Sequence, residues 1–280
     1  MGGAEGLIRR AQPWLGTFVE IGVAAGHDVA IEAAFAEVAR VHRLMSFHEE
    51  TSDVARLRAA SAGAAVILDA DTVAVLKIAA ELHRATDGLF DVTIGRQLVR
   101  NGFLPRTSST DLARFSGTTR DIEIIDDTSI RLHRPMLIDL GGIAKGYAVD
   151  RAVAVLCDAG VGFGIVNAGG DLRVFGPVAM PIEVRIGAGT LSVPFEVTDC
   201  AVATSDNIRL RRRISGRTVT PHIGIDRRSV IVDHAVTVIA DTCVVADAMT
   251  KVAAVDPDLA DRLLAHHRGY VVRHALEAAA

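Results

Sequence analysis

The stretch with the clearest chemical potential lies near the middle of the chain, where an apolar run is followed by two glycines and a second periodic run. Met136–Asp139 is typical of the end of a buried strand, and Gly141 and Gly142 predict a turn. The periodicity then predicts a helix over residues 144–157 that stops at Gly160. Backbone N–H groups at such a helix start suit a phosphate, and turn carbonyls beside a carboxylate suit a cation.

Two charged side chains flank this turn. Asp139 ends the apolar run, and Lys145 stands in the first helical turn, where the helix dipole disfavours a cation unless an anion or acid lies near. The same residues also fit an ordinary strand-to-helix connection, in which Asp139 caps the strand and Lys145 is solvated. Their spacing alone leaves both interpretations open.

Further polar residues stand at places where apolar runs end. Asp91 and Thr93 are two residues apart and would share one face of an extended segment, either as turn caps or as ligands of a polar group. Thr204 lies at a predicted strand end, and His222 is isolated in a loop. Asp247 has Thr250 and Lys251 one helical turn later, on nearly the same face.

The predicted elements that position these residues alternate between helices and strands. The apolar face Ile31, Phe35, Val38, Val41 and Met45 predicts a helix that begins at Asp28. Further helices are predicted over residues 71–86 and 241–255, and strands over 14–23, 201–207 and 236–239. A hairpin is predicted over residues 122–132, and two strands joined by a Gly-Gly turn over 164–174. Because the chain shows no repeat and no long linker, we expect a single domain over residues 1–280.

Composition narrows the class of protein. The chain has 280 residues, half of them apolar, and a formal net charge of −4. Nearly balanced charges and few aromatic residues argue against a nucleic-acid partner. The apolar run Val236–Val255 is interrupted by charges, so we expect no membrane span. Three cysteines without paired spacing and an N-terminus without an apolar signal region favour a cytoplasmic protein.

Seven motifs, in order along nearly the whole chain, resemble those of the ApbE family of FAD:protein FMN transferases. Each motif is weak alone, but their shared order is specific. They are Trp14–Thr17, Met45-Ser46 with Ser52-Asp53, Gly88–Thr93, Asp139–Asp150, Asn167–Asp171, Ala203–Ser205 and Ala246–Met249.

The resemblance implies an α+β, T-fold-like architecture with two α/β sub-parts around a flavin cleft. It also implies that FAD and Mg²⁺ are bound, that the FAD pyrophosphate is cut, that FMN passes to a Thr or Ser hydroxyl of an acceptor protein, and that AMP is released. A pyrophosphate needs its charge neutralised while a hydroxyl attacks in line, and hard oxygen ligands suit Mg²⁺.

The resemblance also implies roles for individual residues. The catalytic candidates are His222, which would assist the attacking hydroxyl, and Asp139. The metal ligands would be a turn carbonyl at Gly142 together with Asp247 and Thr250. The residues expected to contact FAD are Met45, Phe90, Asp91, Asp139, Lys145, Thr204 and His222.

The chain departs from the family pattern at two places. Lys251 stands where the family has a metal-binding Thr, so its ammonium either replaces Mg²⁺ or simply pairs with Asp247. The His222 loop reads HIGIDRRS, with its Asp226 one place late and without the family's Pro and Gly. Two alternatives to the transferase follow: a catalytically impaired FAD-binding protein, and an FAD pyrophosphatase that yields FMN and AMP.

Overall fold

The computed structural model describes residues 6–106, 111–186, 190–191, 194–206, 208 and 210–275. The chain forms two compact units. Unit 1 consists of Met1–His42, Ile143–Arg209 and Val232–Ala280, and unit 2 of Arg43–Gly142 and Leu210–Ile231. The mixture of helices and antiparallel sheets confirms the predicted α+β class. The single domain expected over residues 1–280 stays a prediction.

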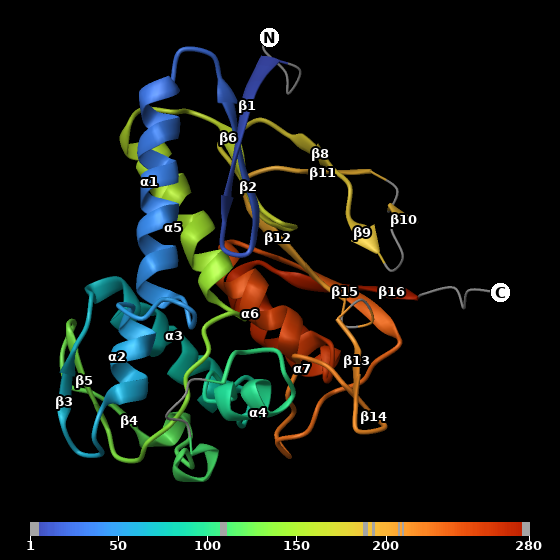
Figure 1. Ribbon diagram of the computed structural model, residues 1–280. Coiled ribbons are helices and arrows are strands. Elements are labelled where there is room, and N and C mark those ends of the chain that lie inside the picture. Colours follow the sequence, from blue (N-terminus) through green and yellow to red (C-terminus); the bar gives the residue numbers. More distant parts are fainter. Residues whose placement is uncertain are drawn as a thin grey trace. The chain divides into compact units, whose positions relative to one another are not determined.

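Unit 1 is built on one seven-stranded sheet with the order β1-β2-β6-β7-β12-β15-β16, in which neighbouring strands are antiparallel (Figure 1). The strands are β1 (Leu7–Trp14), β2 (Thr17–Ala24), β6 (Gly164–Ala168), β7 (Asp171–Phe175), β12 (Cys200–Ser205), β15 (His234–Ala240) and β16 (Tyr270–Ala275). The central strands are buried on both faces, which explains their nearly continuous apolar sequence.

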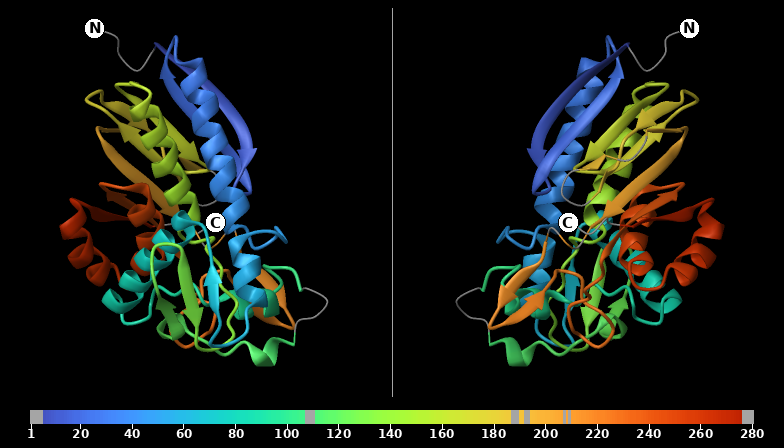
Figure 2. Two further views of the ribbon diagram at one scale, coloured as in Figure 1. Left: turned by 90° about the vertical axis from the view of Figure 1, so that its left-hand side faces the viewer. Right: turned by 90° about the vertical axis from the view of Figure 1, so that its right-hand side faces the viewer.

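Helices cover one face of this sheet, as the two views in Figure 2 show. They are α1 (Asp28–Met45, whose last residues belong to unit 2), α5 (Ala144–Asp158), α6 (Cys243–Ala253) and α7 (Pro257–Leu264), followed by the short η4 (Ala265–His267). The predicted apolar face of α1 is buried along its whole length, from Ile31 to Met45. This confirms the helix, because only a 3.6-residue period places those side chains on one side.

Short strands cover the opposite face of the sheet. β8 (Met180–Ile182) pairs with β11 (Phe195–Val197), and β9 (Arg185–Ile186) pairs with β10 (Thr190–Leu191). Met180 and Ile182 pack in one apolar cluster with Ile165 of β6 and Val202 of β12. The sheet is therefore the middle layer of unit 1.

Unit 2 contains two small antiparallel sheets and short helices. Its elements are α2 (Asp53–Ala59), β3 (Ala65–Ile67), α3 (Ala70–Ala85), α4 (Gly95–Arg100), η2 (Leu112–Arg114), η3 (Thr119–Asp121), β4 (Ile122–Ile124), β5 (Ser129–Leu132), β13 (Arg212–Ile214) and β14 (Arg217–Val219). One sheet has the order β3-β5-β4, which confirms the hairpin predicted at residues 122–132, and the other joins β13 to β14.

Two predictions about strands need correction. Met136–Asp139 belongs to no strand, although its three apolar side chains are buried. Its backbone bonds to the segment before α4, through the Asp139 N–H to the Val92 carbonyl (2.8 Å). The strand predicted at residues 14–23 is the second arm of a hairpin, since Leu15 and Gly16 form a turn with positive φ (57° and 73°). β1 was not predicted, because an edge strand with the consecutive charged residues Arg9 and Arg10 shows no alternation of apolar and polar residues.

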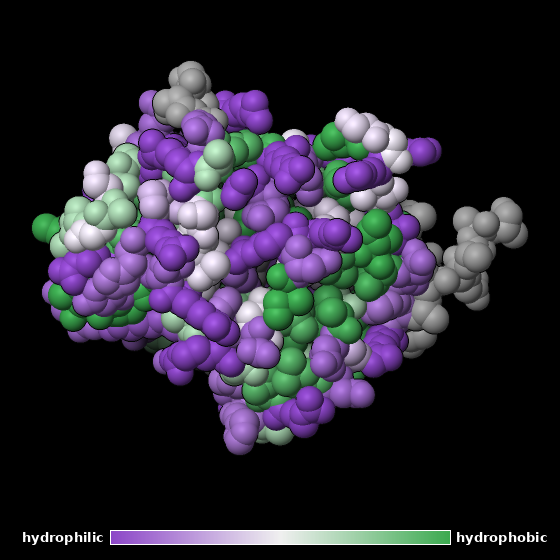
Figure 3. All heavy atoms as spheres, turned by 90° about the horizontal axis from the view of Figure 1, so that it is seen from below, coloured by the Kyte–Doolittle hydropathy of each residue, from purple (hydrophilic) through white to green (hydrophobic). Residues whose placement is uncertain are grey.

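The surface carries both hydrophilic and hydrophobic residues. On the face in Figure 3, green apolar side chains lie between purple hydrophilic ones. Large apolar side chains that stay exposed include Phe18, Val29, Ile67 and Ile225. None of the helices in the described part of the chain is both long and apolar enough to cross a membrane.

Candidate functional site

The start of α5 carries an ion pair in unit 1. The Lys145 ammonium in the first turn pairs with the carboxylate of Asp171, which is 3 % exposed. Asp171 begins β7 directly after a turn of Gly169 and Gly170, whose φ values of 67° and 105° favour glycine. The acid that the helix dipole demands near Lys145 is thus Asp171. Asp171 is not among the predicted site residues, although the Gly-Gly-Asp turn was a usable signal.

A second ion pair lies on α6, as the four-residue spacing predicts. The Lys251 ammonium pairs with Oδ1 of Asp247 and also donates to the main-chain carbonyl of Asp247 (2.8 Å). The other oxygen, Oδ2, accepts the N–H of Gly146 (3.1 Å). The hydroxyl of Thr250 donates to the same main-chain carbonyl of Asp247 (2.7 Å). Asp247 is fully buried, and donors reach both of its carboxylate oxygens.

Gly146 allows the two helices to approach. A Cβ at this position would collide with the main-chain carbonyl of Cys243 and lie 2.8 Å from Cα of Val244. Without a side chain, α5 passes close to the start of α6, and the Gly146 N–H reaches the Asp247 carboxylate. The glycine of the Ala-Lys-Gly-Tyr sequence is therefore required by packing.

Asp150, one turn further along α5, fixes the start of α6. Its carboxylate accepts the N–H groups of Cys243 (2.9 Å) and Val244 (2.8 Å) and pairs with Arg173 of β7 (2.9 Å). Burial raises the pKa of Asp150, although these three donors act in the opposite direction. One face of α5 thus holds both β7 and α6 in place.

Lys145, Asp171, Asp247 and Lys251 form one electrostatic group, which we call the ion quartet. Burial raises the pKa of Asp171, and the carboxylate of Asp247 adds to the rise, while direct contact with Lys145 favours the charged form. Burial also acts on Asp247, but the ammonium groups of Lys251 and Lys145 outweigh it and lower the pKa of Asp247. Burial opposes the charge on Lys145, yet Asp247 and Asp171 raise its pKa.

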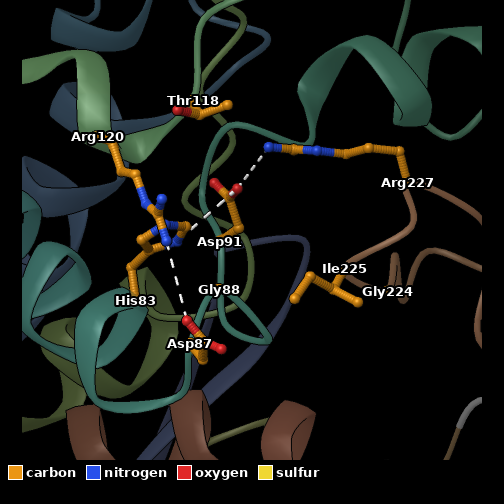
Figure 4. Close-up of a pocket in the computed structure, with 9 residues that line it drawn as sticks. All are labelled: His83, Asp87, Gly88, Asp91, Thr118, Arg120, Gly224, Ile225 and Arg227. Atoms are coloured by element: carbon orange, nitrogen blue, oxygen red, sulfur yellow. Dashed lines mark hydrogen bonds and ion pairs between the residues drawn. The ribbon is translucent and has the colours of Figure 1, made fainter.

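Unit 2 holds a polar pocket of about 240 Å³, shown in Figure 4. Its walls come from the end of α3, the following loop, the start of η3 and the loop after β14. The lining residues are His83, Asp87, Gly88, Asp91, Thr118, Arg120, Gly224, Ile225 and Arg227. Two arginines, one histidine and two carboxylates make this a site for a polar ligand with hydrogen-bonding groups.

Asp91 is the centre of the hydrogen bonds in this pocket. Its Oδ1 accepts from the N–H and hydroxyl of Thr93 (2.7 and 2.6 Å) and from the hydroxyl of Thr119 (2.8 Å). Its Oδ2 pairs with the guanidinium of Arg227 (2.6 Å), and Nδ1 of His83 lies 3.9 Å away (Figure 4). The segment is a turn rather than a strand, so Asp91 caps Thr93 and also faces the pocket.

The loop with the unusual HIGIDRRS sequence closes on itself. The carbonyl of His222 accepts from the Val230 N–H (2.8 Å), and the Gly224 N–H donates to the Arg228 carbonyl (2.8 Å). Arg227 has a left-handed φ of 61° at the tip and donates to Asp91. The loop departure therefore supplies the guanidinium that binds Asp91. This partner of Asp91 was not predicted, because 136 residues separate the two.

The other candidate residues lie in both units. In unit 2, Met45 ends α1, Phe90 is buried, and the Asp139 carboxylate lies 3.2 Å from where a Cβ on Gly141 would stand. In unit 1, Thr204 of β12 shares a hydrogen bond of 2.8 Å with Thr237. Of the expected metal ligands, Asp247 and Thr250 lie together on α6, while Gly142 ends a segment of unit 2.

The fold and the site define a class: an α+β protein with glycine-rich turns, a lysine ammonium at a helix start, and a polar pocket. The sequence places it more closely. The model of the ApbE family matches residues 15–272, and the chain belongs to this family.

The curated relatives are 25–29 % identical to the chain over the residues that match. A protein of Vibrio cholerae named FAD:protein FMN transferase is 28 % identical over 233 residues, which cover 75 % of this chain and 68 % of that protein. A Rhodobacter capsulatus protein of the same name is 29 % identical over 203 residues, or 63 % of this chain and 38 % of that protein.

Solved structures show the same fold. The ApbE protein of Thermotoga maritima has a TM-score of 0.82 and 26 % identity, over 97 % of this chain and 96 % of that one. The apo form of the flavinyl transferase ApbE of Pseudomonas stutzeri has a TM-score of 0.81 and 22 % identity, over 97 % and 92 %.

Proposed function

We propose that the chain is an FAD:protein FMN transferase, which cuts the pyrophosphate of FAD, transfers FMN to a Thr or Ser hydroxyl of an acceptor protein and releases AMP. The observation that carries the proposal is the family match over residues 15–272, joined to relatives that share this name. The ammonium groups at α5 and α6 support it, because pyrophosphate chemistry needs positive charge held in place.

The cofactor contacts implied by the family resemblance remain the proposed set. Lys145 would face the phosphates from the first turn of α5, where the positive end of the helix dipole adds to the attraction. Asp91 is anchored by Arg227 at the wall of the polar pocket and would bind a hydrogen-bonding part of FAD. Met45, Phe90, Asp139, Thr204 and His222 complete the proposed set of cofactor contacts.

The transfer balances with one bond formed and one broken. The acceptor hydroxyl oxygen bonds to the phosphorus of the FMN half, the bond from that phosphorus to the bridging oxygen breaks, and AMP leaves with the electron pair. His222 is proposed to take the hydroxyl proton, and Asp139 to orient the reacting groups. With water in place of the hydroxyl, the same step would give free FMN and AMP.

The side chains on α6 do not fit a divalent cation as they stand. Mg²⁺ prefers charged oxygen ligands at short distances and in a near-octahedral geometry. Both oxygens of Asp247 already accept from donors, and Lys251 puts a positive charge on the carboxylate that would bind the metal. The described residues also hold no group of three His, Cys, Asp or Glu side chains placed for a metal ion. We therefore derive no step through Mg²⁺.

Incubation of the purified chain with FAD, with and without protein extract from the source cells, tests the proposal. We expect chromatography to detect AMP. We also expect a fluorescent flavin band on a protein of the extract that stays attached in an SDS gel. AMP with only free FMN would make the chain a pyrophosphatase. Bound FAD without AMP, in either Mg²⁺ or a chelator, would make it a binding protein.

The role of His222 has its own test. His222→Ala should lower AMP release by about 10²–10⁴-fold, the usual effect of removing a general base. FAD affinity should stay nearly unchanged, because His222 is one of several proposed contacts and the others remain. His266→Ala, an exposed histidine in η4, is the control. An unchanged rate in His222→Ala would remove this loop from the mechanism. The cytoplasmic location stays a prediction.

A further inference from the structure

The ion quartet presents its charges unevenly. The side chain of Asp247 is fully buried and that of Asp171 is 4 % exposed, whereas Lys251 and Lys145 keep 23 % and 30 % of their side chains exposed. The carboxylates therefore lie beneath the ammonium groups. A ligand that approaches this part of unit 1 meets the cations first.

The choice of lysine at these two positions is itself informative. The sequence has three lysines among its 30 lysine and arginine residues, and two of the three belong to the ion quartet. A lysine ammonium is a compact point charge, whereas an arginine guanidinium is a broad planar fork. A compact cation on a buried carboxylate occupies the kind of place that a metal ion takes.

The charges of the quartet also cancel. Two carboxylates face two ammonium groups, and the neighbouring Asp150 is paired with Arg173. An added divalent ion would meet no uncompensated carboxylate among these groups and would lie beside the Lys251 ammonium. Thr250 does not offset this, since its buried hydroxyl donates to the Asp247 carbonyl within the helix.

We propose that the Lys251 ammonium takes the place of the divalent cation on Asp247, so that Lys251 and Lys145 neutralise the pyrophosphate of FAD without a metal on α6. The proposal rests on the proposed function for the identity of the ligand. It makes Lys251 a binding residue for a diphosphate, and Asp247 the group that positions it.

Metal binding gives the first test, and it does not depend on activity. Mn²⁺ serves as a spectroscopic probe, followed by its electron paramagnetic resonance during titration. The wild type should show no saturable site. The control Lys77→Thr, which changes the one lysine outside the ion quartet, should show none either. Lys251→Thr should gain one, at least tenfold tighter than any Mn²⁺ binding in the wild type. Saturable binding in the wild type that Asp247→Asn abolishes would overturn the proposal.

Catalysis in a chelator gives the second test. The wild type should release AMP from FAD at a similar rate in EDTA and in Mg²⁺, whereas Lys251→Thr should depend on Mg²⁺. A wild-type rate that collapses in EDTA and returns with Mg²⁺ would contradict the proposal. If AMP never appears, the proposed function fails, but the Mn²⁺ titration of the wild type still decides the role of Lys251 on Asp247. The expected result, no saturable Mn²⁺ site in the wild type, is read without any variant.

Discussion

At the scale of single residues, spacing reveals some partners and hides others. The pair Asp247 and Lys251 could be predicted, because residues four apart meet on one helix face. The pair Asp91 and Arg227 could not, since the contact depends on how the chain returns to α3 after β14. Asp171 is an intermediate case. Its motif can be recognised in the sequence, but its pairing with Lys145 cannot be predicted, because Lys145 belongs to a different element.

The Arg227 contact predicts a measurable effect on stability. Arg227→Leu should lower the free energy of unfolding by about 1–3 kcal/mol, because it leaves the buried Asp91 carboxylate without its cation. Asp91 keeps its bonds from Thr93 and Thr119, which limits the loss. Urea unfolding measures the change. The neighbouring Arg228→Leu, at an 86 % exposed side chain, should stay within about 0.5 kcal/mol. Equal effects in both variants would show that the contact contributes little.

At the scale of elements, the helices predicted from strong periodicity are confirmed, whereas the strand predicted from a short apolar run is wrong. α1 and α5 follow their predicted ranges, because long apolar faces have one reasonable interpretation. The strand predicted at Met136–Asp139 is wrong, because a short apolar run indicates burial but not strand pairing, and here the backbone bonds go to loop segments. The strand β1 was not predicted, because an edge strand needs little apolar surface.

The approach of α5 to α6 gives an element-scale prediction. Gly146→Ala should destabilise unit 1 by about 1–3 kcal/mol, because the new methyl group meets the Cys243 carbonyl and cannot be accommodated without moving a helix. Alanine has a helix propensity about 1 kcal/mol better than glycine, so the sign of the change tests packing directly. Gly162→Ala is the control, since its added Cβ meets nothing within 4 Å. Thermal unfolding measures both, and a stabilised Gly146→Ala would contradict the packing argument.

The hydrogen bond that the Arg151 side chain of α5 donates to Glu37 of α1 (3.0 Å) should contribute a stability that depends on pH. Hydrogen bonds from Arg40, and secondly from Arg151, outweigh burial and lower the pKa of Glu37 from 4.5 to about 2. A lowered pKa in the folded state means that this contribution to stability is complete above about pH 4.5 and is lost as the pH falls toward 2.

Urea unfolding of the wild type and Glu37→Gln checks this dependence. The stability difference between the two proteins should be constant from pH 5 to 7 and shrink as the pH approaches 2. Glu32→Gln, an exposed acid on the same helix, should change stability little throughout. A difference that does not vary with pH would place the contribution of Glu37 in packing rather than charge.

At the scale of the whole molecule, order along the chain predicted more than any single motif. The family match spans residues 15–272 and therefore includes segments of both units. The way these units interleave was not predictable, because each collects segments that lie far apart in sequence. Polar pairs such as Lys145–Asp171 and Asp91–Arg227 therefore form between segments whose spacing does not predict the contact.

The ligand preference of the complete chain follows from these charged groups. FAD should bind at least tenfold tighter than FMN, a difference of about 1.4 kcal/mol, and riboflavin should bind weakest. The reason is that FAD brings a diphosphate to the two ammonium groups and adds an adenosine half, whereas riboflavin brings no charge. Calorimetric titration with the three flavins measures the order. Lys145→Met should narrow the gap between FAD and riboflavin, since it removes one ammonium, while Lys77→Met should leave the gap unchanged. Equal affinities for the three flavins would mean that the phosphates are not recognised, and the ion quartet would then serve only to hold α5, α6 and β7 together.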